Sequence, residues 1–349
     1  MTDNRTRFPA EWEEASDVLL ALPDSHTDWA YILEEARQQY VRLIGAIAGE
    51  GLAATVLCRD IKEAESLLAG VMTPRVRLVQ ADYNDTWTRD YGPLTVVRDG
   101  ERIRLLDFGF NGWGLKFASD KDNLVNMHLA SDLVIHPDLY RNNRDYVLEG
   151  GSVESNGAGT ILTTTRCLCS PNRNGGRSKG EINHILAERL GADHVLWLDH
   201  GYLAGDDTDS HIDTLARLAP DDIILFTGCR DMDDEHFEEL LKMRAQLSLM
   251  RTAEGNPFNL VELPLPSPIY DEEGQRLPAT YANYLVYGDC IFMPVYNQPE
   301  NDLLACRTIK VAYPAHKVVP VDCTTLIKQH GSLHCATMQL YETFNKKQE

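Results

Sequence analysis

The stretch Gly331-Ser332-Leu333-His334-Cys335-Ala336-Thr337 places a cysteine beside a histidine in a run of small residues near the end of the chain. A turn of this kind can expose a thiol, and an exposed thiolate is a nucleophile. Three upstream segments carry the acids and the second histidine that a thiol-based catalytic site needs: Trp87-Thr88-Arg89-Asp90-Tyr91-Gly92-Pro93, Leu148-Glu149-Gly150-Gly151 and Asp209-Ser210-His211-Ile212-Asp213. Together the four segments predict a site built from loops that are distant in sequence.

The spacing of these segments predicts the fold. Asp90 and Glu149 are 59 residues apart, Glu149 and His211 are 62 apart, and His211 and Cys335 are 124 apart, which is twice 62. Reactive residues that return at one period indicate a repeated unit that places one loop per repeat at a common centre. The same period reaches Glu273 in the acidic run 270–273, so we expect this loop to contact the tail of a substrate. A solvated surface turn is the alternative for that loop.

Apolar periodicity predicts alternating strands and helices along the chain. We expect strands at 17–22, 52–58, 76–79, 103–108, 159–165, 194–198, 222–227, 260–263, 284–295 and 318–321, and helices at 29–48, 61–68, 124–133, 182–190, 234–245 and 302–309. They form about five α/β strand–helix–strand units of ~60 residues, each too short to bury both of its faces alone. A doubly wound sheet is the ordinary architecture for such alternation, but the regular loop spacing favours a ring of units around a central site. No linker divides the chain, so we expect residues 1–349 to be a single catalytic domain.

Composition narrows the classes of partner and compartment. A formal charge of −20 argues against nucleic acid or an anionic membrane as partner and suits a small cationic substrate, although it could serve solubility alone. The polar start Met1–Arg7 leads to no apolar signal region, and no apolar run reaches the ~18 residues of a membrane span. The eight cysteines are scattered singly, which is typical of reduced thiols. We therefore expect a cytoplasmic protein, and a homodimer is left open.

The sequence around the candidate catalytic residues does not fit a metal site. His211 and Asp213 would share a face of an extended strand, which would place an imidazole beside a carboxylate, whereas His334 would point away and be structural. A calcium loop counted from Asp207 lacks its glycine and its final glutamate, and Cys167-Leu168-Cys169 has the wrong gap for zinc. We therefore expect neither a metal nor a cofactor.

Acidic and aromatic residues around Asp90 suit a planar cation. An indole at Trp87 could stack on such a cation while Asp90 accepts paired hydrogen bonds from it. Arg89 has a plainer interpretation as an internal salt-bridge partner, and Glu149 could either orient a histidine or bind loop amides. The predicted substrate-binding residues are Trp87, Arg89, Asp85, Asp207 and Glu273.

At these residues the chain resembles the agmatine deiminase and bacterial-type peptidylarginine deiminase family of guanidine-modifying enzymes. The resemblance runs almost end to end, through Asn84–Pro93, Glu149–Gly151, Gly157–Thr160, Arg173-Asn174, Asp206–Asp213, Tyr296 and His334–Gln339. It implies a five-unit α/β propeller with pseudo-fivefold symmetry and a metal-free hydrolysis. Cys335 would attack the guanidinium carbon, His211 would transfer protons, Asp90 and Asp213 would bind the guanidinium nitrogens, and Glu149 would orient His211.

Two departures from the family pattern leave the substrate open. Ser210 stands where a glycine before the histidine is common, and His330-Gly331-Ser332-Leu333 replaces a glycine-rich run before His-Cys. We expect conversion of agmatine to N-carbamoylputrescine, a step of putrescine and polyamine biosynthesis, with peptidyl-arginine as the alternative substrate. Rivals from other classes are a non-catalytic guanidine-binding protein and a metal-dependent amidohydrolase.

Overall fold

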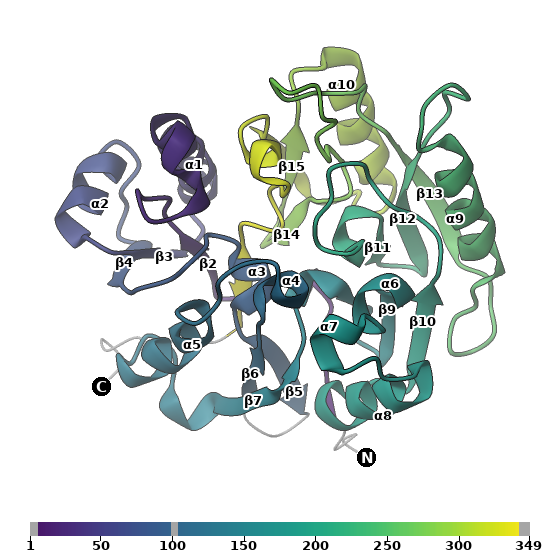
Figure 1. Ribbon diagram of the computed structural model, residues 1–349, viewed down its shortest axis with the longest axis horizontal. Coiled ribbons are helices and arrows are strands. Elements are labelled where there is room, and N and C mark those ends of the chain that lie inside the picture. The colour runs from purple at the N-terminus through teal and green to yellow at the C-terminus, as the bar shows by residue number, and fades with distance from the viewer. Residues whose placement is uncertain (1–5, 99–103, 342–349) are drawn as a thin grey trace. The chain divides into compact units, whose positions relative to one another are not determined.

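The computed structural model describes residues 6–98 and 104–341 (Figure 1). Residues 1–5 of the polar start and residue 103 of the strand expected at 103–108 therefore lie outside the described residues. The chain forms two compact units. Unit 1 contains Met1–Thr6, Glu14–Gly150 and Cys335–Glu349, and unit 2 contains Arg7–Glu13 and Gly151–His334. The single-domain expectation stays a prediction.

The first sheet of unit 1 joins the beginning of the chain to its end. Its strand order is β17 (Met338–Leu340), β2 (Asp17–Ala21), β3 (Ala54–Cys58) and β4 (Val76–Gln80). Strand β17 runs antiparallel to β2, and the other neighbours are parallel. Helices α1 (Leu33–Gly49) and α2 (Ile61–Leu68) pack on this sheet (Figure 1). Because β2 and β3 are buried throughout, they are apolar runs instead of alternating ones.

The second sheet of unit 1 has the order β1 (Thr6–Arg7), β5 (Leu94–Arg98), β6 (Arg104–Gly109) and β7 (Tyr140–Val147). Strand β5 is antiparallel to β6, and β6 is parallel to β7 across helix α5 (Asp122–Ser131). Two short helical turns, α3 (Thr88–Tyr91) and α4 (Gly112–Leu115), follow the ends of β4 and β6. These turns carry candidate site residues.

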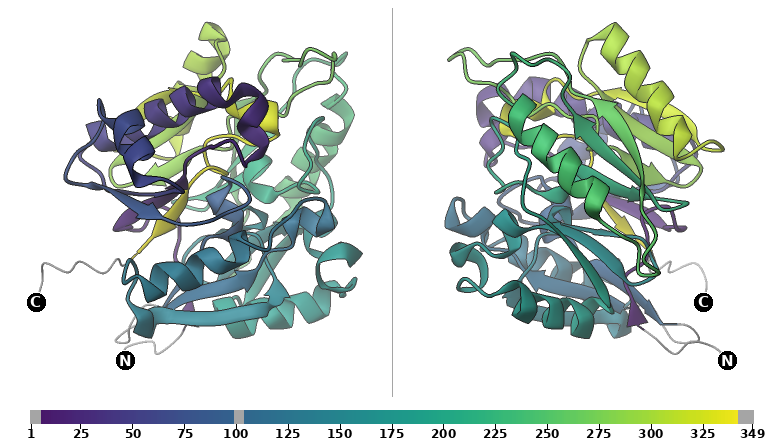
Figure 2. Two further views of the ribbon diagram at one scale, coloured as in Figure 1. Left: turned by 60° about the vertical axis from the view of Figure 1, so that its left-hand side comes forward. Right: turned by 90° about the vertical axis from the view of Figure 1, so that its right-hand side faces the viewer.

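Unit 2 contains three sheets of three strands each. Their orders are β10 (His194–Leu198), β9 (Thr160–Thr164), β8 (Val153–Ser155); β11 (Ala216–Ala219), β12 (Ile223–Gly228), β13 (Asn259–Pro264); and β14 (Leu285–Tyr287), β15 (Cys290–Val295), β16 (Lys317–Asp322). The intervening helices are α6 (Thr165–Leu168), α7 (Pro171–Asn174), α8 (Lys179–Leu190), α9 (Phe237–Leu249) and α10 (Pro299–Thr308). Figure 2 shows α9 beside β12 and α10 beside β13, where they cover the sheets. Short 3₁₀ turns lie at Asp28–Ile32, Pro137–Leu139, Gly150–Ser152, Ile212–Thr214, Ile309–Val311 and Leu326–Gln329.

One pattern recurs in all five sheets: an antiparallel strand lies next to a strand–helix–strand pair whose strands are parallel. In the sheet that contains β2 and β3, the antiparallel strand is β17, which comes from the C-terminal part of the chain. The first repeat is therefore completed by the last strand. The expected mixed α/β class is therefore confirmed. The arrangement of the five sheets around one axis stays a prediction.

The structure corrects one expected strand and adds several. Residues 284–295 are not one strand but the hairpin β14–β15, which turns at Gly288 and Asp289 with φ of 59° at the glycine. A Gly-Asp pair between apolar runs is a hairpin signal, so the information was present in the sequence. Strands β5, β7, β8, β11 and β17 were not expected. Strands β8, β11 and β17 have only three or four residues and β7 is polar, whereas β5 is apolar and lies in the antiparallel position beside β6.

Among the helices of the described residues, none combines the length and the apolar character that a bilayer span requires.

Helix α9 offers a matched test of the core of unit 2. Leu247 is fully buried in a cluster with Leu215, Ile224 and Met243, whereas Leu249 on the same helix is 73% exposed. Leu247→Ala should lower the free energy of unfolding by about 2–5 kcal/mol, because it removes buried methyl groups and leaves a cavity. Leu249→Ala should stay within about 0.5 kcal/mol of the parent. Chemical denaturation checks both, and equal losses would contradict the packing described.

Candidate active site

Cys335 lies in a buried turn of unit 1 that is fixed to the start of α3. Cys335 is 6% exposed, and its carbonyl oxygen accepts a hydrogen bond from the Arg89 amide at 3.2 Å. The Thr88 hydroxyl lies 3.1 Å from the carbonyl oxygen of Ala336 and 2.9 Å from that of Leu19. The backbone around Cys335 is therefore positioned by the residues directly before Asp90.

Asp90 is a buried carboxylate whose orientation is set by an indole. The Trp113 Nε1–H donates to Asp90 Oδ2 at 2.9 Å, and both side chains are nearly inaccessible to solvent. Trp113 has a φ of 53°. Gly112 before it has a φ of 65°, and Gly114 and Leu115 after it have φ values of 82° and 71°. Residues 112–115 therefore form one turn of left-handed backbone, a conformation that glycine adopts freely and other residues rarely. The sequence prediction missed Trp113, and the flanking glycines were the available signal.

The other predicted residues of this loop make internal contacts in unit 1. Trp87 packs on Trp29 with ring centroids 5.8 Å apart. Asp85 accepts a hydrogen bond from the Thr86 amide at 2.7 Å, within its own loop. The Arg89 guanidinium donates to the Gln339 side chain at 2.5 Å, which anchors α3 to β17. Arg89 thus has an internal partner, as its plainer interpretation expects, and substrate binding by Arg89 stays a prediction.

A buried carboxylate supports this loop from α5. Asp122 accepts hydrogen bonds from the backbone amides of Asn84 at 2.7 Å and Asp85 at 3.2 Å. Burial raises the pKa of Asp122 to about 7, against the opposing effect of those two amides. The turn before Trp87 is therefore tied to the helix by a group that is itself fully buried.

Glu149 is fully buried near the end of the Glu14–Gly150 segment of unit 1, and the next residue lies where two backbone segments approach closely. A Cβ on Gly150 would lie 2.2 Å from the Arg89 carbonyl oxygen, a distance that no side chain could occupy. The glycine after Glu149 is therefore required for the loop to lie against α3. Glycine permits such a close backbone approach because it has no Cβ.

In unit 2, the loop before His211 is held by its own acids and by one arginine. Asp206 accepts from the Ser210 amide at 2.7 Å, and the buried Arg173 donates to Asp209 at 2.6 Å and to the Thr208 carbonyl at 2.8 Å. Asp209 and Ser210 both have positive φ, 67° and 62°. A positive φ at Ser210 is a conformation that glycine adopts readily, and the surrounding hydrogen bonds hold the serine in it here.

The sequence pattern predicted that Asp213 and His211 share a face of an extended strand, and the structure shows that this prediction is wrong. Residues 212–214 form a 3₁₀ turn, because the chain reverses into β11 at this point. Asp213 is fully buried, and its Oδ2 lies 2.7 Å from Nδ1 of His334. His334 is therefore in contact with a candidate site residue, and its structural role stays a prediction. His211 is also fully buried.

The remaining two predicted residues of unit 2 lie nearer its surface. Asp207 is half-buried, and Glu273 is exposed on a turn closed by the bridge between Tyr270 and Arg276. Asp271 caps that turn by accepting from the Gln275 amide at 2.7 Å. The contacts of this loop are those of a self-contained turn, so its role in substrate binding stays a prediction.

The second family departure, Ser332, has a defined contact. Its hydroxyl lies 2.8 Å from the hydroxyl of Tyr296, which also donates to the Thr280 carbonyl at 2.8 Å. The serine thus joins the run before His334 to Tyr296, which directly follows β15.

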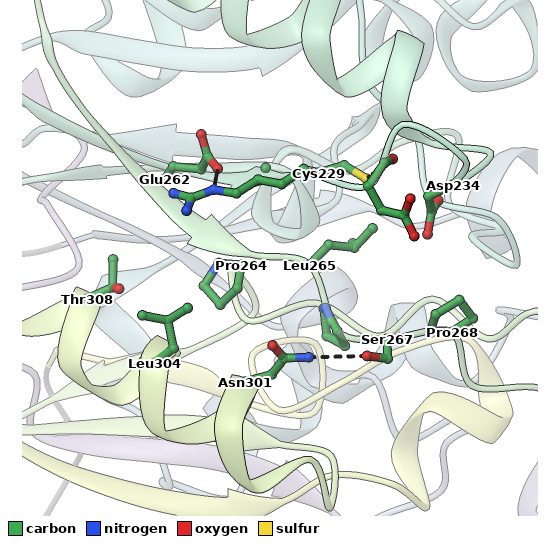
Figure 3. A pocket seen from close by; sticks show the side chains of 14 residues that line it. Cys229, Asp234, Glu262, Pro264, Leu265, Ser267, Pro268, Asn301, Leu304 and Thr308 are labelled. Atoms are coloured by element: carbon green, nitrogen blue, oxygen red, sulfur yellow. Dashed lines mark hydrogen bonds and ion pairs between the residues drawn. The ribbon is translucent and has the colours of Figure 1, made fainter.

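A pocket of about 320 Å³ lies at the carboxyl ends of β12 and β13 in unit 2 (Figure 3). Cys229, Glu262, Pro264, Ser267 and Asn301 are among its lining residues. Burial raises the pKa of the Cys229 thiol, which makes it a poor nucleophile. The pocket contains none of the predicted site residues.

Residues 7–340 match the family described as Porphyromonas-type peptidyl-arginine deiminase. The chain belongs to this family. The resemblance inferred from the sequence motifs is therefore confirmed.

Named relatives within and around the family differ in their stated substrates. A solved structure of a candidate peptidyl-arginine deiminase is 44% identical, with a TM-score of 0.91 over 97% of this chain and 99% of that one. A cysteine-to-serine variant of the C. jejuni agmatine deiminase, with substrate bound, is 35% identical, with a TM-score of 0.89 over 97% of each chain. A candidate agmatine deiminase of Vibrio parahaemolyticus is 30% identical over 95% of this chain and 96% of its own length.

The close approach at Gly150 gives a test of the loop geometry. Gly150→Ala should lower the free energy of unfolding by about 1–3 kcal/mol, because the new methyl group overlaps the Arg89 carbonyl. Gly49→Ala is the matched control: nothing lies within 4 Å of its would-be Cβ at the end of α1, and alanine favours helix by up to about 1 kcal/mol. Thermal and chemical unfolding measure both. A neutral Gly150→Ala would show that the two segments do not approach so closely.

Proposed function

We propose that this protein hydrolyses a guanidinium group with a cysteine nucleophile and releases ammonia, and that its substrate is agmatine, converted to N-carbamoylputrescine. The observation that carries the proposal is the likeness over 97% of the chain to an agmatine deiminase with substrate bound. The family match over residues 7–340 supports the same class, hydrolases that act on carbon–nitrogen bonds. The residues to which the resemblance assigns the chemistry, Cys335, His211, Asp90, Asp213 and Glu149, are all present in this chain.

In the proposed mechanism the sulfur of Cys335 attacks the guanidinium carbon and forms a C–S bond. His211 donates a proton to one nitrogen as the C–N bond breaks, so that ammonia leaves. His211, now neutral, accepts a proton from water, which adds to the thiouronium carbon. The C–S bond then breaks, the thiolate is released, and the adduct loses its hydroxyl proton, which is taken up by the released ammonia as ammonium, so that the neutral ureido product remains. One water is consumed and one ammonia is formed in each turnover.

The carboxylates serve this reaction by binding the substrate cation. Asp90 and Asp213 accept hydrogen bonds from guanidinium nitrogens, which offsets the charge and fixes the plane of the reacting group. Glu149 orients the His211 ring. The burial of Asp90, Asp213, Glu149 and His211 in their loops supports these roles, because electrostatic interactions strengthen where water is excluded.

A peptidyl-arginine substrate is the second candidate. The 44% identity to a candidate peptidyl-arginine deiminase favours it, whereas the net charge of −20 favours a small dication over a peptide. Ammonia release should be measured with agmatine, arginine, and peptides carrying internal or C-terminal arginine. Turnover of agmatine alone supports the first proposal, and turnover of peptides alone supports the second.

The cellular compartment and the domain organisation of the protein are further proposals. We propose a cytoplasmic enzyme, supported by eight cysteines that are all free thiols, and a single catalytic domain whose five sheets surround one axis. The recurring sheet pattern supports the fivefold arrangement, and a homodimer remains open.

Cys335→Ser should abolish turnover while agmatine still binds, because an alcohol lacks the thiolate character that attack on the guanidinium requires. Mass spectrometry of quenched parent enzyme should find a substrate adduct on Cys335. Cys323→Ser is the control, since that thiol is fully buried and bonds a backbone carbonyl at 3.3 Å, and it should keep its activity.

An adduct on another cysteine, with Cys335→Ser still active, would overturn the mechanism. Iodoacetamide should stop the reaction while a strong chelator leaves it unchanged. The reverse pattern would favour a metal-dependent amidohydrolase, and tight binding of agmatine without turnover by the parent protein would favour a non-catalytic binding protein.

Trp113→Phe should lower kcat/KM for agmatine by about 10-fold, because the Asp90 carboxylate loses a charge-assisted hydrogen bond while the aromatic packing is kept. Trp197→Phe is the control, because that indole donates at 2.9 Å to Asn183, a residue outside the proposed site. Steady-state kinetics measure both variants. Equal values for Trp113→Phe and the parent would remove the role of the indole in orienting Asp90.

A further inference from the structure

The residue before the proposed nucleophile lies in a buried network of charged groups within unit 2. His334 is 2% exposed. Its Nδ1 lies 2.7 Å from Oδ2 of Asp213, and its Nε2 lies 3.1 Å from Oε2 of Glu11. The ring is thus in contact with a carboxylate at each nitrogen.

The contact with Asp213 fixes which ring nitrogen carries a proton. An ionised carboxylate only accepts hydrogen bonds, so Nδ1 must be the donor. Nε2 lies between the Glu11 carboxylate and the Arg217 guanidinium, 3.2 Å from the nearer nitrogen of Arg217. It can therefore donate to the first or accept from the second. In both cases Nδ1 keeps its hydrogen and donates to Asp213.

Arg217 and Glu11 hold the far side of the ring in place. The Arg217 guanidinium forms ion pairs with Glu11 and Glu154 and donates to the carbonyls of Ala282 at 3.0 Å and Tyr284 at 2.7 Å. The other oxygen of Glu11 accepts from the Val286 amide at 2.8 Å. A ring with both edges bonded to groups that are themselves anchored has little freedom to rotate.

The same cluster has the composition of a metal site but is better explained without one. Ligand atoms of Glu11, Glu154 and His334 lie within 4.8 Å of one another. The Arg217 guanidinium already bonds both carboxylates, so it supplies the positive charge that a cation would supply there. The network is therefore a support for the imidazole.

We propose that His334 is a positioning residue: its Nδ1–H holds the Asp213 carboxylate in the orientation that binds the guanidinium, and Glu11 and Arg217 hold His334. This inference rests on the proposed function for the role of Asp213. It assigns a task to the N-terminal segment Arg7–Glu13 as well, because Glu11 is the carboxylate that bonds Nε2.

The test compares two amides that differ in where they place a donor. In His334→Asn the side-chain NH₂ falls near the position of Nδ1, and in His334→Gln it falls near Nε2. The first variant should retain kcat/KM for agmatine within about 5-fold of the parent, and the second should lose about 10–100-fold, the loss typical of a displaced positioning group.

His236→Leu is the matched control for loss of a buried imidazole. His236 is also 2% exposed in unit 2 and bonds Asp234 through Nδ1 at 2.8 Å, but Asp234 is paired with Arg276 and is outside the proposed site. It should lower the melting temperature and leave kcat/KM nearly unchanged. If His334→Gln behaved like this control, or if His334→Asn lost as much activity as His334→Gln, the proposal would be overturned.

A second measurement, of the protonation of His334 itself, tests the positioning role independently of the proposed hydrolysis. In protein labelled with ¹⁵N-histidine, the His334 signals, identified by their absence in His334→Asn, should show a protonated Nδ1. An unprotonated Nδ1 would overturn the proposal even in an active enzyme. A parent protein that released no ammonia from any guanidino substrate, with Nδ1 protonated, would instead overturn the proposed function and leave the hydrogen bond to Asp213 intact.

Discussion

Two buried carboxylates, Asp90 and Asp213, impose the main physical constraint on this protein. An ionised carboxylate removed from water is costly unless hydrogen-bond donors replace its hydration. In unit 1 the Trp113 indole donates to Asp90, and in unit 2 the His334 ring lies 2.7 Å from Asp213, to which we propose that it donates. In each case a ring nitrogen holds one oxygen of the carboxylate in position.

Two loops that carry or contact candidate site residues are built from backbone that most residues avoid. Trp113 lies in a left-handed turn, and Asp209 and Ser210 adopt positive φ directly before His211. Such conformations cost about 1–3 kcal/mol each and persist where the surroundings determine them. Around Asp209 and Ser210 the surroundings are the Asp206 carboxylate and the buried Arg173, which donates to Asp209 and to the Thr208 carbonyl. The scaffold of five sheets thus supports loops that would not hold their shape alone.

The sequence predicted the regular elements better than the contacts that orient the site. Apolar runs located β3, α2 and β10 because buried strands and amphipathic helices leave strong periodic signals. Strands β8 and β17 escaped, because three residues carry no measurable period, and β7 escaped because it is polar.

For the site, the reactive residue types and their spacing identified Cys335, His211 and the acids as candidates. Their orienting partners could not be found in this way. Glu11 bonds His334 across 323 residues, and Trp113 bonds Asp90 across 23, and neither pair has a local sequence signature. The extended conformation assumed for His211 and Asp213 failed because a 3₁₀ turn, stabilised by tertiary contacts, replaces it.

The most direct test of this account is a crystal structure of the Cys335→Ser variant with agmatine bound. The account predicts guanidinium nitrogens within about 2.7–3.2 Å of the carboxylate oxygens of both Asp90 and Asp213. It also predicts that the hydrogen bonds from Trp113 and His334 to these carboxylates are kept. A guanidinium bound elsewhere, for example in the pocket beside Glu262, or one that contacts neither aspartate, would contradict it.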